Sequence, residues 1–567
     1  MANEFLAIGH PRFIDPHLAE LAVSDGAIAA WRRVISASDK LQATNAVHGD
    51  FAVGVRLPCG GTFLAVDRFA IRTLCYKVSN GQLHFAERAD ELTDASTVID
   101  HQAIFDYFYF HCIPSPRTIF KDIHRLPPGH YAWFDGSKLT IVPYWVPEFA
   151  ERRDVPFDGL SDEFRRLLRQ AVANQLDGGK PACFLSGGTD SSTVAGMIGQ
   201  VGGDAAATYS IGFEAEGYDE MEFARIAARK FGTEHHEYYV TPDDLVRSIP
   251  LVAAHYDQPF GNSSALPAYY CAKMAKADGV NKILGGDGGD ELFGGNTRYA
   301  KQKVFGWYGL FPGAVRRGVM EPVLGGGKLG KFPGIGKAAS YVEQAKVPMP
   351  DRLQMYNLII RLGTSSVFTG GFLEGIDSGL PLQHQREVWK SAKLPCSDLN
   401  RQLAFDWRYT LAESDLPKVV GTTTLAGLEV GFPLLDDRLL EFSLRLPTAY
   451  KLKGLKLRWF FKEALKGFLP DEIIAKKKQG FGLPFGVWLV KHAALRKLAE
   501  ESLRGLVDRG IVRRDFVDAL FGRYLNEHPG YYGEMVWISM ILEQWLKGWD
   551  SRRNNRSSDL SMAMLAV

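Results

Sequence analysis

Phe184-Leu-Ser-Gly-Gly-Thr-Asp-Ser-Ser192 lies between an apolar run and a segment with helical patterning. The preceding residues, Ala182–Leu185, are continuous and apolar, which is typical of the end of a buried strand. The residues that follow Ser192 place Val194, Ala195, Met197 and Ile198 on one face of a helix. The stretch therefore predicts a strand, a tight loop and a helix in succession.

The loop has the composition of an anion-binding turn. Gly187 and Gly188 let the backbone turn tightly and approach a ligand without interference from Cβ atoms. Ser186, Ser191 and Ser192 add hydroxyl donors, and the start of the helix offers unpaired N–H groups. These features together predict a cradle for pyrophosphate.

Asp190 distinguishes this loop from the common phosphate-binding loop, in which a Lys follows the glycines. A carboxylate repels a phosphate unless a cation stands between them. Asp190 is therefore a candidate Mg²⁺ ligand that bridges to phosphate oxygens. The alternative is an ordinary capping turn, since Ser, Asp and Gly are common before helices.

Length and composition limit the class of protein. A chain of 567 residues has room for two or three domains, and 46% hydrophobic with 23% charged residues is ordinary for a globular protein. The net charge of +1 gives no indication of a basic surface for binding nucleic acid. Neither a secretion signal nor a membrane-spanning segment is expected, and six scattered cysteines without a CxxC pair suit reduced thiols in the cytoplasm.

The chain changes character near residue 150. Before it, Phe51–Arg56, Thr62–Val66 and Leu74–Val78 are short β-type runs separated by turns. After it, helical segments alternate with apolar strands such as Ala205–Ile211 and Lys282–Leu284. This alternation predicts a parallel, doubly wound α/β sheet, whose ligands bind beyond the carboxyl ends of the strands.

A second glycine-rich loop, Gly285-Gly-Asp-Gly-Gly-Asp-Glu-Leu-Phe-Gly-Gly295, follows the second of these strands. We expect Asp290 to complete a Mg²⁺ site with Asp190, and Asp287 to face the reacting substrate. Taken alone, the loop could also be a Ca²⁺-like turn or a plain hairpin. Farther along, Lys476–Gly482 is a basic run from which a Lys could neutralise a leaving pyrophosphate, or which could be solvated surface.

These motifs resemble those of the asparagine synthetase family. Ser186–Ser192 matches its SGGxDSS loop, and Gly285–Glu291 is similar to SGxGxDE with Gly in place of Ser. Leu428–Asp436 resembles LEVRxPFLD, and Lys478–Gly482 resembles the KxGFG turn with its phosphate-contacting Lys. The similarity runs from about residue 160 to residue 490.

The resemblance implies two domains, with ATP and Mg²⁺ as cofactors. Residues 1–145 would form a degenerate Ntn-hydrolase-like αββα glutaminase domain. Residues 160–550 would form a doubly wound adenine-nucleotide α-hydrolase domain of the PP-loop ATP pyrophosphatase type. Residues 551–567 are expected to be a disordered tail because Ser551–Asp559 is polar. The reaction implied is attack of a substrate carboxylate on the α-phosphorus of ATP, followed by attack of an amine or ammonia on the acyl-adenylate.

Site residues carry over from the family one by one. The pyrophosphate and Mg²⁺ would be held by Ser186, Gly187, Gly188, Asp190, Ser191 and Ser192, with Asp290 as the second metal carboxylate. Leu185, Ile211 and Gly286 would line the nucleotide. The catalytic residues implied are Asp287, which would orient the nucleophile, and Lys478, which would stabilise charge on phosphate.

The N-terminal part departs from the family pattern. The glutaminase domain of the family begins Met-Cys-Gly, whereas this sequence begins Met1-Ala-Asn3. The family's glutamine-holding NGEIYN segment has no counterpart here. The scaffold persists, since Gly49–Ala52 and Asp67–Leu74 resemble GxFAF and DRxGxKPL. We therefore expect a retained glutaminase fold without glutaminase activity.

The motifs around residues 416–431, which we call the acceptor side, depart from the family pattern as well. Leu416–Gly421 replaces LxKxDR, so Val420 and Gly421 stand where the family has Asp and Arg, and Gly431 replaces the Arg of LEVR. These losses suggest a pocket for a different substrate, although a structural ion pair could simply have been dropped.

Three functions follow as hypotheses. The first is an amide-forming ligase that joins a small or peptidic carboxylate to an amine, similar to lasso-peptide cyclases or β-lactam synthetases, which also lack the glutaminase Cys. The second is asparagine synthesis from aspartate and ammonia. The third is a non-catalytic, nucleotide-binding partner of another synthetase. A homodimer or a biosynthetic partner protein is plausible, whereas nucleic acid and membrane are not expected as partners.

Overall fold

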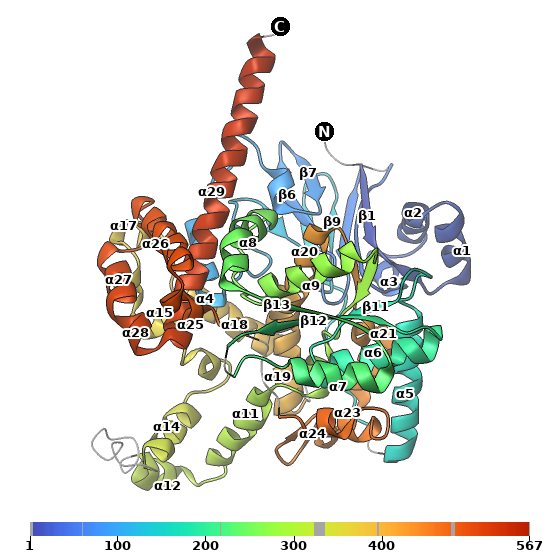
Figure 1. Cartoon of the computed structure of the whole chain (residues 1–567). Coiled ribbons are helices and arrows are strands. Elements are labelled where there is room, and N and C mark those ends of the chain that lie inside the picture. The colour runs from blue at the N-terminus through green and yellow to red at the C-terminus, as the bar shows by residue number, and fades with distance from the viewer. Residues whose placement is uncertain are drawn as a thin grey trace.

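A computed structural model describes residues 4–58, 60–152, 154–215, 217–321, 335–393, 396–477 and 482–565. Its chain forms an N-terminal half with a five-stranded and a three-stranded antiparallel sheet and a C-terminal half with a five-stranded parallel sheet (Figure 1), and each half also has a two-stranded antiparallel sheet. The three predicted N-terminal strand runs are present, as β4 (Phe51–Arg56), β5 (Thr62–Val66) and β6 (Cys75–Ser79). In the described part of the chain, no helix combines the length and apolar character needed to cross a bilayer.

The N-terminal half is layered helix, sheet, sheet, helix, because alternate residues of each strand face opposite cores. One core lies between α2 (Ala27–Ala37) and the larger sheet, where Trp31 meets Phe51 and Phe63. The other face of the same sheet packs on the smaller sheet through residues such as Leu64 and Phe85. The larger sheet has the order β1 (Phe5–Gly9), β4, β5, β9 (His130–Phe134), β10 (Leu139–Pro143), and the smaller one β7 (Gln82–Ala86), β6, β8 (His124–Arg125).

This layering confirms the αββα arrangement implied by the resemblance. The outer face of the smaller sheet, through Cys75, shares a core with α4 (His101–Phe110) and with the C-terminal half. The two halves are therefore joined by a continuous hydrophobic core. The remaining N-terminal elements are α1 (Pro16–Ser24), α3 (Lys40–Asn45), β2 (Arg12–Phe13) and β3 (Val47–His48).

The C-terminal half is built on a five-stranded parallel sheet, as predicted. Its order is β13 (Glu234–Val240), β12 (Ala207–Phe213), β11 (Ala182–Phe184), β14 (Lys282–Leu284), β15 (Glu429–Gly431). The strand order reverses between β11 and β14, so the crevice at their carboxyl ends is the expected ligand site of this fold. Both glycine-rich loops follow these two strands.

Helices cover both faces of the parallel sheet. Figure 1 shows α6 (Thr189–Gly202) and α7 (Met221–Phe231) on one side and α8 (Pro242–His255) and α9 (Ala265–Ala277) on the other. Each parallel connection needs such a crossover helix to bury its apolar stripe on the sheet. Further elements are α5 (Phe157–Ala173), α10 (Gly289–Phe293), α20 (Leu416–Ala426), α21 (Asp437–Arg445), α22 (Thr448–Lys451), β16 (Leu452–Lys453), β17 (Lys456–Leu457) and α23 (Trp459–Ala464).

Helices inserted between β14 and β15 form an arm that points away from the sheet, with α11 (Thr297–Tyr308) and α14 (Ile335–Lys346) at its lower left in Figure 1. The arm returns through α18 (Leu380–Ser391), α19 (Asp398–Asp406) and a π-helical segment, Trp407–Asp415. The C-terminal helices include α25 (Phe485–Lys491), α26 (Ala493–Asp508), α27 (Arg514–Ala519) and α29 (Pro529–Leu565).

Helix α29 extends through most of the segment 551–567, for which the sequence predicts a disordered tail. Its first turns are anchored by buried residues such as Trp537 and Trp545. Once a helix is nucleated, each added residue gains a backbone hydrogen bond at small entropic cost, so the polar segment continues the helix to Leu565.

Lys451 gives the fold a pH-dependent stability. It is fully buried, with its Nζ 3.1 Å from Asn400 Oδ1 and over the Phe149 ring, and this burial lowers its pKa to about 7. In the unfolded chain the pKa returns to its ordinary value of 10.5, so between pH 7 and 10 the unfolded state binds more protons. Stability is therefore expected to rise with pH in that window.

Urea unfolding of wild type and Lys451→Met at pH 7 and pH 9 checks this. The wild type should gain about 2 kcal/mol over the variant between the two pH values. An equal change in both proteins would contradict the lowered pKa of Lys451.

Candidate active site

A cavity of about 410 Å³ opens at the carboxyl ends of β11, β12 and β14. It lies where the strand order reverses, between β11 and β14, and residues from helices on both faces of the sheet line it. Eight of the sequence-predicted site residues line it: Leu185, Ser186, Asp190, Ser191, Ile211, Gly286, Asp287 and Asp290. The two loops thus meet in one site, as the sequence analysis expects.

The Ser186–Ser192 loop has the geometry of an anion cradle. Gly187 has a φ of +68°, and a Cβ there would lie 2.4 Å from the backbone nitrogen of Ala224, so only Gly fits. Helix α6 begins at Thr189, and no described side chain caps it at Gly188. A helix start without a side-chain cap is suited to binding an anion.

The serines of this loop play different parts. Ser191 Oγ accepts from the Ser186 backbone N–H at 3.2 Å and lies 3.1 Å from Ser186 Oγ, so the two hydroxyls sit together at the cavity. Ser192 is fully buried within α6 and is absent from the cavity lining, as are Gly187 and Gly188. The glycines shape the backbone, and the structure places the Ser192 hydroxyl away from the cavity surface.

Asp190 and Asp290 both contact Arg458, a residue that the sequence analysis does not identify. Arg458 Nη1 lies 2.8 Å from Asp190 Oδ2, 2.8 Å from Asp290 Oδ1 and 2.8 Å from Thr189 Oγ1, and Nη2 contacts the other oxygen of Asp190. Although burial opposes the charge, the two carboxylates raise the pKa of Arg458 above its ordinary value. The guanidinium, 4% exposed, is therefore a permanent positive charge between them.

Packing fixes the position of this guanidinium. Arg458 has a φ of +53°, and its side chain lies over the Phe461 ring at 4.2 Å from the ring centre. The sequence signal was a lone Arg inside the apolar run Leu457–Phe461, where a buried charge needs carboxylate partners.

Two glycines make room for the carboxylates. A Cβ at Gly289 would collide with Asp190 Oδ1, and a Cβ at Gly295 would collide with Asp290 Oδ1. Gly289 thus permits the close approach of the two acidic loops, and Gly295 leaves room for the Asp290 carboxylate within its own loop.

The carboxylate pair fits Mg²⁺. The part of the chain that the structure describes contains no group of three or more His, Cys, Asp or Glu side chains arranged as a metal centre. Mg²⁺ is usually bound through one or two carboxylates together with substrate phosphates, and Asp190 and Asp290 beside an anion cradle supply that donor set.

The acceptor side of the cavity carries a buried charge cluster. Lys418 Nζ lies 3.2 Å from Asp415 Oδ1 and 3.6 Å from Asp287 Oδ1. Although burial opposes its charge, these carboxylates raise the pKa of Lys418 above its ordinary value. Burial raises the pKa of the Asp287 carboxyl, against the effect of Lys418. Asp415 was not singled out from the sequence, because it belongs to no motif there.

The substituted acceptor positions do not line the cavity. Val420, Gly421 and Gly431 are absent from its lining, which contains their neighbours Lys418 and Val419. A Cβ at Gly421 would lie 2.4 Å from the Tyr256 ring, and a Cβ at Gly431 would lie 2.4 Å from Gln175 Oε1. At these positions, neighbouring side chains fill the space that larger residues would need.

The predicted phosphate-contacting residue, Lys478, lies outside the described residues. Nearby Lys476 does approach the cradle, since its Nζ is 3.4 Å from the backbone oxygen of Gly187 and 3.1 Å from Glu220 Oε1. The basic run therefore contacts the Ser186–Ser192 loop through Lys476.

Comparison with known proteins supports the resemblance to the asparagine synthetase family. Residues 163–547 match the family model for asparagine synthase, and residues 39–145 match a glutamine amidotransferase domain. Asparagine synthetase [glutamine-hydrolyzing] 1 of Bacillus subtilis is 26% identical over 493 residues, 85% of this chain and 74% of that protein. A putative asparagine synthetase [glutamine-hydrolyzing] 2 of Methanocaldococcus jannaschii is 33% identical over 245 residues, 42% of this chain and 47% of that protein.

A third relative carries a different name. Amidase chyE of Penicillium rubens is 24% identical over 485 residues, 75% of this chain and 68% of that protein. The family model covers well over half of the 567 residues. The chain therefore belongs to the asparagine synthase family, whose asparagine synthetases are carbon–nitrogen ligases that form AMP and pyrophosphate.

Proposed function

We propose that this protein is an ATP-dependent ligase that adenylates a substrate carboxylate and transfers the acyl group to a nitrogen nucleophile. The observation that carries the proposal is the pairing of Asp190 and Asp290 on Arg458 beside the Ser186 cradle. Two carboxylates that face each other at an anion-binding loop suit the binding of Mg²⁺ and pyrophosphate. A domain with a purely structural role would have no need of them.

In the first half-reaction a carboxylate oxygen attacks the α-phosphorus of ATP. The bond from that phosphorus to the bridging oxygen breaks, and its electron pair leaves with pyrophosphate. Ser186, Ser191 and the first N–H groups of α6 would hold the pyrophosphate, with Lys478 as a further candidate cation. Asp190 and Asp290 would hold Mg²⁺, which supplies positive charge to the phosphates when bound.

In the second half-reaction nitrogen attacks the acyl carbon. The new C–N bond forms as the C–O bond to AMP breaks, and nitrogen loses a proton. Asp287 is the candidate acceptor for that proton, because it lines the cavity and burial raises the pKa of its carboxyl above the ordinary value. Leu185 and Ile211 would form the apolar wall for the adenine.

We further propose a tailoring ligase, similar to lasso-peptide cyclases, in which the nitrogen comes from an amine of a substrate. Among the described cavity-lining residues, Lys418 is the one cation, and Asp415 and Asp287 already neutralise it. A substrate with a single reacting carboxylate suits this arrangement better than free aspartate, which carries two carboxylates. The described cysteines of the N-terminal half, Cys75 and Cys112, are buried, and burial raises the pKa of both thiols, Cys75 to about 12.

The second candidate is asparagine synthesis with ammonia as the nitrogen source. The names of the Bacillus and Methanocaldococcus relatives favour asparagine as the product. Pyrophosphate release from ATP, measured over a panel of carboxylates with and without amines, separates the two. A tailoring ligase should release pyrophosphate with an acid other than aspartate. Release that requires both aspartate and ammonium would support asparagine synthesis instead.

Gly289→Ala tests the cradle without removing a functional group. The added Cβ collides with Asp190 Oδ1, so the two acidic loops must separate. Pyrophosphate release should fall about 100-fold, because small displacements of reacting groups have effects of this size. The matched control is Gly306→Ala in α11, where a Cβ meets nothing within 4 Å. Unchanged activity of Gly289→Ala would show that the loops do not need this approach.

A further inference from the structure

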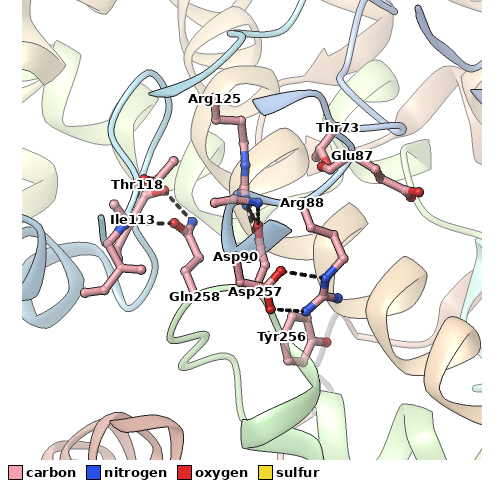
Figure 2. A network of polar contacts seen from close by, with 12 residues as sticks. Thr73, Glu87, Arg88, Asp90, Ile113, Thr118, Arg125, Tyr256, Asp257 and Gln258 are labelled. Atoms are coloured by element: carbon pink, nitrogen blue, oxygen red, sulfur yellow. Dashed lines mark hydrogen bonds and ion pairs between the residues drawn. The ribbon is translucent and has the colours of Figure 1, made fainter. Parts of the chain in front are cut away.

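The loop between α8 and α9 is held by the N-terminal half through Asp257. The Ala89 backbone N–H donates to Asp257 Oδ2 at 3.0 Å, and Arg125 Nη2 lies 3.1 and 2.9 Å from its two oxygens. Arg88 pairs with Asp90 and donates to the His255 carbonyl at 2.9 Å. Figure 2 shows Arg125 and Arg88 directed from the N-terminal half onto this loop.

Gln258 ties the same loop a second time. Its Nε2 donates to the Ile113 carbonyl at 3.2 Å, and its Oε1 accepts from the Ile119 backbone N–H at 3.3 Å. Both Asp257 and Gln258 are thus bound by the segment 88–125 of the N-terminal half (Figure 2). Nearby hydrogen bonds of this kind fix a loop that would otherwise be free to move.

The other side of this loop supports the acceptor side of the cavity. Tyr256 Oη donates to the Lys418 carbonyl at 3.2 Å, and its ring occupies the space left by Gly421. Asn262 Nδ2 donates to Ser414 Oγ at 3.1 Å, next to Asp415, and Ser264 lines the cavity itself.

A second anchor reaches the cavity through Glu413. Its Oε1 accepts from the Ser115 backbone N–H at 3.1 Å and from Ser115 Oγ at 2.7 Å, and it pairs with Arg408. Glu413 lies in the π-helical segment that carries Thr410 and Asp415 into the cavity. This carboxylate is 5% exposed, so its N-terminal donors are not easily replaced by water.

The part of the cavity around the Ser186–Ser192 loop receives its contacts from the C-terminal half. Arg458 binds Thr189, Asp190 and Asp290, all from the C-terminal half. No residue of the described part of segment 4–145 lines the cavity. Of the contacts between the halves, those at Asp257 and Glu413 therefore connect the N-terminal half to the acceptor side of the cavity.

We infer that the N-terminal half positions the acceptor side of the cavity, with Arg125 and Ser115 as positioning residues for Lys418 and Asp415. The inference rests on the proposed ligase function. It gives this half a present role in substrate binding that does not depend on glutamine hydrolysis. Loss of the contacts made by Arg125 or Ser115 should weaken binding of the carboxylate and the amine. It should leave the part of the cavity around the Ser186–Ser192 loop intact.

Arg125→Met in the full chain tests the inference first by hydrogen–deuterium exchange. Exchange should rise in peptides covering 256–264 and 407–421, and stay as in wild type for 186–200 and 285–295. This readout requires no substrate, so it stands even if the proposed function fails. Uniform exchange increases, or none in 407–421, would overturn the inference.

Binding and kinetics give the second readout. The Kd for Mg²⁺ with a non-hydrolysable ATP analogue should stay within twofold of wild type, and the KM for a carboxylate that supports pyrophosphate release should rise about 10-fold or more. Arg125→Lys and Ser115→Ala should give smaller changes in the same direction. An equal loss of nucleotide affinity would indicate general damage and overturn the inference.

The matched control is Arg68→Met. Arg68 Nη1 lies 3.1 Å from Asp437 Oδ1, also across the two halves and with a side chain 13% exposed, but neither residue lines the cavity. This variant should lose stability without a change in the KM for the carboxylate or in exchange of 407–421. If Arg68→Met raised the KM as much as Arg125→Met, the effect would not be specific to the acceptor side.

Discussion

Arg458→Met is expected to destabilise the protein strongly when Mg²⁺ is absent. The substitution leaves Asp190 and Asp290 opposed with side chains 17% and 15% exposed, without the guanidinium that now pairs with both. Removing one partner of a buried ion pair costs about 3–5 kcal/mol, because the remaining charge stays desolvated. Thermal unfolding without nucleotide should therefore show a much lower Tm than in wild type.

Mg²⁺ should restore part of that loss in the variant. A divalent cation can take the place of the guanidinium between the carboxylates, so the Tm of Arg458→Met should rise more on addition of Mg²⁺ than the Tm of wild type. Arg458→Lys, which keeps the charge but not the forked geometry, should fall between the two. If Arg458→Met matched wild type with and without Mg²⁺, Arg458 would not organise the carboxylate pair.

Asp190→Asn should abolish most pyrophosphate release while leaving the fold intact. The amide still accepts from Arg458, but it removes one carboxylate from the pair that would hold Mg²⁺ against the phosphates. Loss of one preorganised electrostatic group at a reacting centre typically lowers the rate by about 10²–10³-fold. Pyrophosphate release in a single turnover, together with the Tm, measures both parts of the expectation.

Asp158→Asn, an exposed substitution in the first turn of α5, is the control and should keep full activity. Sustained pyrophosphate release by Asp190→Asn would contradict the assignment of the cradle. If wild type releases pyrophosphate but the cellular function survives in Asp190→Asn, the non-catalytic, nucleotide-binding role becomes the better explanation.

Much of the cavity around Ser186, Asp190 and Asp290 could be predicted, because the sequence patterns that indicate it involve neighbouring residues. A strand, a Gly-Gly turn and a helix start are set by neighbouring residues, and so Ser186, Asp190, Asp287 and Asp290 were identified without any tertiary information. The strands Phe51–Arg56 and Lys282–Leu284 were found with their bounds for the same reason. Motif spacing then placed two loops after two strands of one sheet, where their ends must meet.

The acceptor side was harder to predict, because its signals are distant in sequence. Losses at Gly421 and Gly431 suggested a changed pocket, yet Tyr256 and Gln175 lie against those positions and neither glycine lines the cavity. A substitution at one position can be matched by packing from another element, and the motif alone does not show that partner.

The sequence by itself determined the two-domain α/β architecture and the two glycine-rich loops that carry Asp190 and Asp290, since these depend on backbone turns between adjacent elements. Only the tertiary structure decided what stands between Asp190 and Asp290, because Arg458 is 268 residues from Asp190 along the chain. It likewise decided that Asp257 and Glu413 receive their donors from the N-terminal half. Buried charges are stabilised by whatever partner the packing of distant elements brings to them, and that choice is made by the fold as a whole.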